Sequence, residues 1–117
     1  MSDFPTYCAR TSAKLWREMS EYLSRDTETS QWLSDLLAST TRSFIRDGIA
    51  DDQALVRNKA GWISEEGCYS TCDAGLIDVD GDTYIMSIMT SMPWSDRSSE
   101  LVAAIAKIFF DTRAVLA

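Results

Sequence analysis

Apolar residues recur at the spacing of a helix in the first forty positions of the chain. Between residues 11 and 25 the apolar side chains lie three or four positions apart, at Leu15, Trp16, Met19, Tyr22 and Leu23. The same spacing predicts a second helix over residues 29–41. We expect Thr11 or Ser12 to cap the first helix and Thr29 to cap the second, because hydroxyl side chains accept hydrogen bonds from the unpaired N–H groups of a first turn.

The pattern then changes to that of strands. Three short apolar segments, at residues 54–63, 70–79 and 82–92, are each bounded by Gly, Asp or Pro, and this predicts three strands. Asp80 and Gly81 separate the second segment from the third. An Asp-Gly pair in this position predicts a two-residue hairpin turn, since both residues tolerate a positive φ.

The stretch between the second helix and the first strand, SFIRDGIADDQ, has no clear periodicity and is expected to form a loop. At the other end of the chain, an apolar stripe predicts a helix over residues 96–114 with Ser95 as its cap. The predicted class is α+β: two N-terminal helices, a three-stranded antiparallel sheet and a C-terminal helix packed on the sheet. We expect residues 1–117 to form a single domain.

Charge and hydropathy exclude several classes of function. The net charge is −7, with 18 acidic and 11 basic side chains, so the protein is not expected to bind the phosphate backbone of nucleic acids. No apolar run approaches the roughly 20 residues that a membrane-spanning helix needs. The first residues lack the basic start and apolar centre of a signal peptide, so a cytoplasmic location is expected.

The sequence contains no histidine and three cysteines, Cys8, Cys68 and Cys72. Without histidine, the chain cannot form a Ser-His-Asp or Cys-His catalytic arrangement. The C-x3-C pair could form a disulfide if the ends of a hairpin approach, or supply two ligands of a larger site, but free thiols are favoured. The acidic residues of the run from Asp78 to Asp82 lack the glycine and glutamate spacing of a calcium loop. We expect no metal and no cofactor.

Lys59 and Gly61 are unusual within the first predicted strand. On one interpretation, Lys59 is an edge-strand lysine that discourages strand addition, and Gly61 marks a bulge. On the other interpretation, Lys59 attracts an anionic group of a substrate, and Gly61 lets that substrate approach the backbone closely. The Lys-x-Gly motif alone does not decide between them.

The surrounding residues favour the second interpretation. NKAGWI, followed by DAGLIDVDGDTYIMSIMTSMP and a helix with LVAAIAKIFFDTRAVL, resembles the C-terminal part of class A β-lactamases and penicillin-binding proteins. In this family a Lys-Thr-Gly strand precedes an Asp-Ala-Gly strand. RTSAKLWREMSEYL similarly resembles the start of the helix after the omega loop. The resemblance covers nearly the whole chain but only the C-terminal half of the family's domain, and it implies that Lys59, Ala60 and Gly61 form a degenerate substrate-binding strand.

The other motifs of this family are missing from the sequence. Its nucleophile lies in Ser-x-x-Lys, but the residues three positions before Lys14, Lys59 and Lys107 are threonine, valine and alanine. The Ser-Asp-Asn and omega-loop motifs are also absent, and Ala60 replaces the threonine that would help to hold a substrate carboxylate. The resemblance therefore implies a β-lactam or peptidoglycan-like ligand without independent catalysis.

The partner that such a chain would need follows from the same resemblance. In the family, the strand at residues 82–92 would pair with a strand from the N-terminal half of the domain. Its sequence, TYIMSIMT, is uncharged and apolar on both faces, so it would accept another chain. We expect a homo-oligomer or a complementary N-terminal segment as partner. Two alternatives remain open: a small protein-interaction module that uses this sheet edge, or a half-enzyme completed by a chain with Ser-x-x-Lys.

Overall fold

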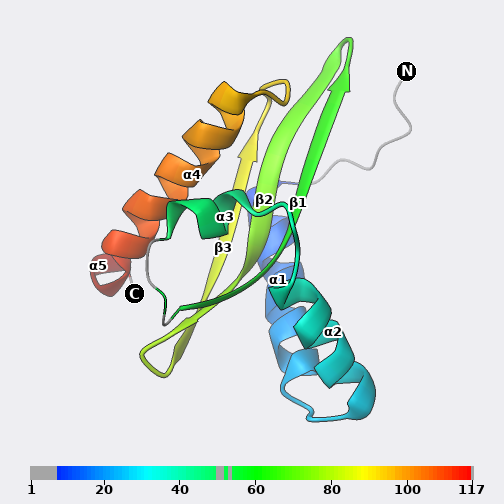
Figure 1. Ribbon diagram of the computed structural model, residues 1–117, viewed down its shortest axis with the longest axis vertical. Coiled ribbons are helices and arrows are strands. Elements are labelled where there is room, and N and C mark those ends of the chain that lie inside the picture. The colour runs from blue at the N-terminus through cyan, green and yellow to red at the C-terminus, as the bar shows by residue number, and fades with distance from the viewer. Residues whose placement is uncertain (1–7, 50–51, 53, 117) are drawn as a thin grey trace.

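The computed structural model describes residues 8–49, 52 and 54–116. It confirms the α+β class and the predicted order of helices, strands and final helix (Figure 1). The elements are α1 (Ala9–Leu23), α2 (Glu28–Ala38), α3 (Phe44–Gly48), β1 (Leu55–Glu65), β2 (Cys68–Val79), β3 (Asp82–Thr90), α4 (Asp96–Asp111) and α5 (Arg113–Leu116).

The three strands form an antiparallel sheet in the order β1-β2-β3. The turn between β2 and β3 has φ angles of 53° at Asp80 and 82° at Gly81, which confirms the hairpin turn predicted from this pair. In the register of the sheet, Gly61 lies opposite Cys72 and Lys59 lies opposite Ala74. Both outer strands are edges within the described part of the chain.

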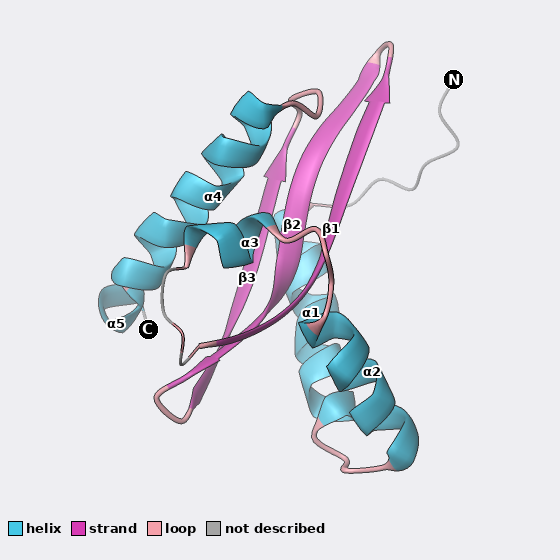
Figure 2. Cartoon of the chain, in the orientation of Figure 1, coloured by secondary structure: helices cyan, strands magenta, loops and turns pink. Residues whose placement is uncertain are grey.

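Helices cover both faces of the sheet (Figure 2). α3 and α4 pack on one face, where they form the main core with β1, β2 and β3. Phe44, Ile45, Val102, Ala106 and Phe110 contribute the helical side of this core. α1 lies across β2 and β3 on the opposite face, and α2 contacts β1. The sheet is therefore the middle layer of three, which positions Lys59 and Gly61 on the α1 side.

The helix boundaries differ from the prediction at several points. α1 begins at Ala9 after Cys8, and no side chain caps it, so the predicted caps at Thr11 and Ser12 were wrong. α2 is capped by Thr27 rather than Thr29, through a capping box with Ser30. The predicted Ser95 cap of α4 is confirmed. The final helix is interrupted after Asp111, so that α5 follows as a separate turn.

The segment expected to be a loop contains the short helix α3. Five residues are too few to give a helical period in the sequence. A tertiary hydrogen bond to the sheet stabilises α3, because the buried carboxylate of Asp73 on β2 accepts from the Ile45 backbone N–H at 3.0 Å. The Ser43 side chain caps the first turn by accepting from the Arg46 N–H. α3 is thus fixed by a contact between residues distant in the sequence.

Candidate functional site

The three residues of the Lys-Ala-Gly motif do not share one face of β1. Lys59 and Gly61 are exposed on the α1 side, whereas Ala60 is only 3% exposed and packs in the core beneath α3 and α4. This division follows from the alternation of side chains along a strand. The Lys59 ammonium donates a hydrogen bond to the backbone carbonyl of Ala60. Lys59 and Gly61 can therefore contact one ligand together, while Ala60 can contribute only its backbone.

A cavity of about 430 Å³ lies beside Lys59 and Gly61. It lies between α1 and the sheet, and its wall includes Ser12 and Trp16 from α1, Cys72 and Ala74 from β2 and Met89 from β3. A volume of this size is within the range of small-molecule sites. The lining combines one cation, Lys59, one acidic residue, Asp73, two small polar side chains and several apolar ones.

Gly61 leaves the approach to this cavity open along β1. A Cβ atom added at Gly61 would meet no heavy atom within 4 Å. Gly75, on β2, is the opposite case, because a Cβ there would lie 2.2 Å from the Arg57 carbonyl oxygen. Gly75 is thus needed for strand packing, whereas nothing in the packing requires glycine at position 61. This difference supports a role for Gly61 in access to the strand.

A buried polar network holds β1 from the opposite face. Asn58 and Asp73 are 0% and 1% exposed, and the Asn58 amide donates to Asp73 Oδ1 at 2.8 Å. Asn58 Oδ1 in turn accepts from Thr40 Oγ1 at 2.6 Å and from Arg46 Nη2 at 3.3 Å. Arg46 also donates to the Val56 carbonyl at 2.8 Å. Because each buried group has a partner, the network fixes the backbone on either side of Lys59.

Burial is the main influence on the charge state of Asp73. Desolvation raises the pKa of Asp73 above its ordinary value, and the hydrogen bonds from Asn58 and Ile45 oppose this rise. A carboxylate held away from water is costly unless it is hydrogen-bonded. Asp73 faces the core, so it supports the strand rather than the cavity.

An aromatic cluster anchors the far end of β1. Trp62 stacks on Trp94 with 5.1 Å between the ring centroids. The Arg42 guanidinium lies 5.7 Å from the Trp62 centroid and 5.0 Å from that of Trp94. Ser64 Oγ accepts from the Trp94 N–H at 3.2 Å. These contacts connect β1 to the loop before α4 and to the loop after α2.

The three cysteines are free thiols, as the sequence favoured. Cys68 and Cys72 lie four residues apart on β2, a separation of roughly 13 Å at the rise of a strand. A disulfide needs Cα atoms within about 7 Å, so these two cannot pair with each other. Hydrogen bonding with Thr11 lowers the pKa of the exposed Cys8 to about 7.

Sequence reasoning identified Lys59 and Gly61 but missed the residues that support them. Asp73 was seen only as part of a family motif, and Arg46 was placed in a loop. One signal was present, because an aspartate and an asparagine within apolar strands need buried partners. The sequence did not indicate that Cys72 lies across from Gly61, since this depends on the register of the two strands.

The β-lactamase enzyme family matches this chain over residues 2–112. The chain therefore belongs to this family. The match includes all of β1, β2 and β3, so it contains the strand with Lys59 and Gly61 and the cavity beside it.

Solved structures with a similar fold include that of PBP-A, with a TM-score of 0.72 and 20% sequence identity. A second match, with the same values, is a mutant of PBP-A determined as an acyl-enzyme complex with penicillin G. The alignment covers 90% of this chain but only 39% of PBP-A, so this chain corresponds to part of the β-lactamase-like fold. No curated protein sequence matches. No helix in the described ranges is long and apolar enough to cross a membrane.

Proposed function

We propose that this protein is a penicillin-recognising domain that binds a carboxylate-bearing ligand at Lys59 and Gly61 without independent catalysis. The main observation is the position of Lys59, which is exposed on an edge strand, beside an unobstructed Gly61 and a cavity of about 430 Å³. An ammonium group and an open strand edge suit a β-lactam or a peptidoglycan-like peptide, both of which carry a carboxylate.

The sequence supports the absence of independent catalysis. None of the three lysines follows a serine at the spacing of Ser-x-x-Lys. Removal of a hydrolase nucleophile reduces turnover by roughly a millionfold. Binding at Lys59 would therefore be reversible, and the ligand would be released unchanged.

Titration calorimetry with benzylpenicillin tests this proposal. We expect the wild-type protein to bind benzylpenicillin reversibly and Lys59→Gln to bind it about tenfold more weakly. The reason is that a charge-assisted hydrogen bond contributes about 1.5 kcal/mol to the binding free energy. Lys107→Gln removes an exposed lysine from α4 and serves as the matched control. Equal affinities for the original protein and Lys59→Gln would refute the binding site. An acyl adduct on a serine or threonine, detected by intact-mass spectrometry, would refute the absence of catalysis.

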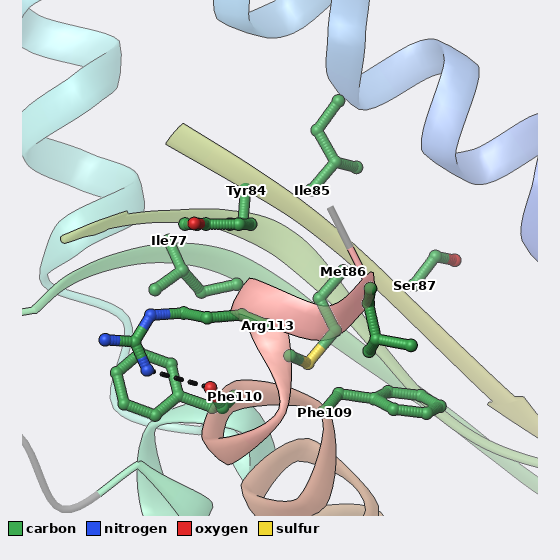
Figure 3. Close-up of a pocket in the computed structure, with 9 residues that line it drawn as sticks. Ile77, Tyr84, Ile85, Met86, Ser87, Phe109, Phe110 and Arg113 are labelled. Carbon is green, nitrogen blue, oxygen red and sulfur yellow. Dashed lines mark hydrogen bonds between the residues drawn. The ribbon is translucent and has the colours of Figure 1, made fainter. Parts of the chain in front are cut away.

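We also propose that a partner binds at the β3 edge of the sheet, the edge opposite to β1 and Lys59. β3 pairs only with β2 in the described part of the chain, and Ile85 at this edge is 37% exposed. A second cavity, of about 330 Å³, lies between β3 and the end of α4, and Figure 3 shows Phe109, Phe110 and Arg113 on its helical side. An uncharged strand edge beside a mostly apolar groove supports addition of a strand from a second copy or from a complementary N-terminal segment.

Light scattering on the purified chain distinguishes these partners. A dimer or larger assembly is expected if a second copy covers β3. A monomer that associates only with a separate β-lactamase-like N-terminal segment would support the complementary arrangement, including a half-enzyme completed in this way. A monomer that binds neither itself nor such a segment would contradict this part of the proposal.

A further inference from the structure

Three exposed aromatic side chains lie together at one end of the sheet. Trp62, Tyr69 and Trp94 are 40%, 43% and 39% exposed. Trp62 and Ser64 are two positions apart on β1 and so point to the same face, and Tyr69 lies opposite Ser64 on β2. Trp94 comes from the loop before α4 and stacks on Trp62. Neither of the two cavities described above includes these rings, so they form an open surface.

An arginine guanidinium lies over this surface without an acceptor of its own. Arg42 is exposed, and its guanidinium is 5.0 Å from the ring centroid of Trp94 and 5.7 Å from that of Trp62. Within the described ranges this guanidinium donates no hydrogen bond and forms no ion pair, although Glu65 and Glu66 follow shortly after Trp62. Stacking on two rings holds the cation in place and leaves the N–H groups at the edge of its plane available to an acceptor.

Packing beneath the surface keeps these groups in one arrangement. The Trp62 ring lies against that of Phe44, which is only 1% exposed, with 6.5 Å between the centroids. The Ser64 hydroxyl accepts a hydrogen bond from the Trp94 N–H at 3.2 Å, which ties the loop before α4 to β1. A surface that is already ordered loses little conformational entropy when a partner binds. These contacts therefore favour binding.

The composition of this surface indicates the chemistry of its partner. Arg42, Trp62, Tyr69 and Trp94, here called the aromatic platform, belong to the residue types that contribute most of the binding energy in protein interfaces. A guanidinium without a partner selects a carboxylate, to which its planar fork can donate two parallel hydrogen bonds. The exposed rings suit an apolar side chain next to that carboxylate. The net charge of −7 disfavours the other common anion, the phosphate backbone of a nucleic acid.

We propose that the aromatic platform binds an acidic peptide segment of a partner protein. A Glu or Asp side chain of the segment pairs with Arg42, and a neighbouring apolar side chain packs on Trp62 and Trp94. An open surface suits a polypeptide, whereas sites for small molecules are concave. Lys59 and Gly61 lie on the opposite face of β1, so this interaction uses other side chains and does not depend on the proposed function.

A peptide array with the full chain tests this proposal. The array carries short peptides of random sequence with blocked termini, so that side chains supply the only carboxylates. We expect the wild-type protein to select peptides in which Glu or Asp lies beside an aromatic or aliphatic residue. Arg42→Gln should lose this selection. Arg25→Gln is the matched control and should keep it, because Arg25 also stacks on a ring, that of Tyr22 at 5.4 Å, but lies just beyond α1.

Calorimetry with the best selected peptide measures the contribution of Arg42. We expect Arg42→Gln to weaken binding about tenfold, since a hydrogen bond between charged groups is worth at least this factor. Replacing the acidic residue of the peptide by its amide should weaken binding to the wild-type protein equally. Arg42→Gln should then bind both peptides with the same affinity, whereas a purely structural effect of the substitution would weaken both peptides by the same factor.

The indole N–H signals in NMR spectra locate the bound peptide. The chain has four tryptophans, Trp16, Trp32, Trp62 and Trp94, and replacing each in turn by phenylalanine assigns its signal. We expect the peptide to shift the signals of Trp62 and Trp94. The signals of Trp16 on α1 and Trp32 on α2 should not move, because these residues lie outside the aromatic platform.

Several results would overturn the proposal. The array could yield no selected peptide, Arg42→Gln could keep the same selection, or the peptide could shift only signals from outside the platform. Chitohexaose, a neutral oligosaccharide, is the competing ligand, because sugar rings also stack on indoles. If it shifts the Trp62 and Trp94 signals and no peptide does, the platform binds glycans instead. Lys59→Gln should not affect peptide binding, and a loss in this variant would place the peptide at the proposed ligand site.

Discussion

The two edges of the sheet have opposite chemistry. β1 carries Lys59 and Gly61 on its α1 face, and the buried amide of Asn58 fixes it from the other face. β3 carries no charge between Thr83 and Thr90, and a mostly apolar cavity, with Arg113 in its wall, adjoins it. A rigid strand with a cation suits a small anionic ligand, whereas an uncharged strand suits another backbone. The difference supports the two separate roles that we propose for the two edges.

Substitution of two glycines gives the largest expected contrast. Gly75→Val places a side chain against the backbone of Arg57, with only 2.2 Å between its Cβ and the carbonyl oxygen. We expect a loss of about 3 kcal/mol or more in the free energy of unfolding, because a packed backbone cannot move aside cheaply. Gly61→Val is the matched control on β1 and should change stability by less than about 1 kcal/mol. Urea unfolding of both variants measures the contrast, and equal losses would contradict it.

The buried carboxylate behind β1 gives a pH-dependent effect of intermediate size. Burial raises the pKa of Asp73, so the folded protein retains this proton to a higher pH than the unfolded chain does. The resulting contribution to stability is complete below the ordinary aspartate pKa of about 3.9 and is lost as pH rises through the raised pKa. The free energy of unfolding of the wild-type protein, minus that of Asp73→Asn, should therefore decrease as pH rises. The total decrease should be about 1.4 kcal/mol for each unit by which burial raises the pKa of Asp73.

Urea unfolding at a series of pH values measures this difference. Asp96→Asn, in the exposed first turn of α4, serves as control for the general effect of removing a carboxylate. A difference between the original protein and Asp73→Asn that does not vary with pH would show that Asp73 has the same pKa in the folded and unfolded states.

A charge at the β3 edge should give the smallest change in stability and a clear change in assembly. Ile85→Lys places an ammonium on the uncharged strand, and its partial exposure should keep the loss near 1 kcal/mol. We expect a shift toward monomer in light scattering, because a charged edge discourages strand pairing. Leu15→Lys, at an exposed apolar position on α1, is the matched control. An equal shift in both variants would place the interface elsewhere.

The fold was largely predictable from the sequence, but the candidate site was only partly so. The periods of α1, β2, β3 and α4 are local, and the Asp80-Gly81 turn depends on the φ preferences of two residues. α3 was missed because its stability comes from Asp73, which lies 28 residues beyond Ile45. Similarly, Lys59 and Gly61 were identified by type and spacing, but Arg46 and Ser12 could not be placed without the packing of distant segments.

The sequence alone determined the order of α1, α2, the three strands and α4, the hairpin turn and the resemblance to the β-lactamase family. These features depend on the backbone preferences and the spacing of residues that are close together in the sequence. Only the tertiary structure decided that Ala60 is buried while Lys59 is exposed, and that Cys72 lies opposite Gly61. Register and the choice of face result from the burial of a whole sheet between two layers of helices, and a change of one residue in register would reverse both.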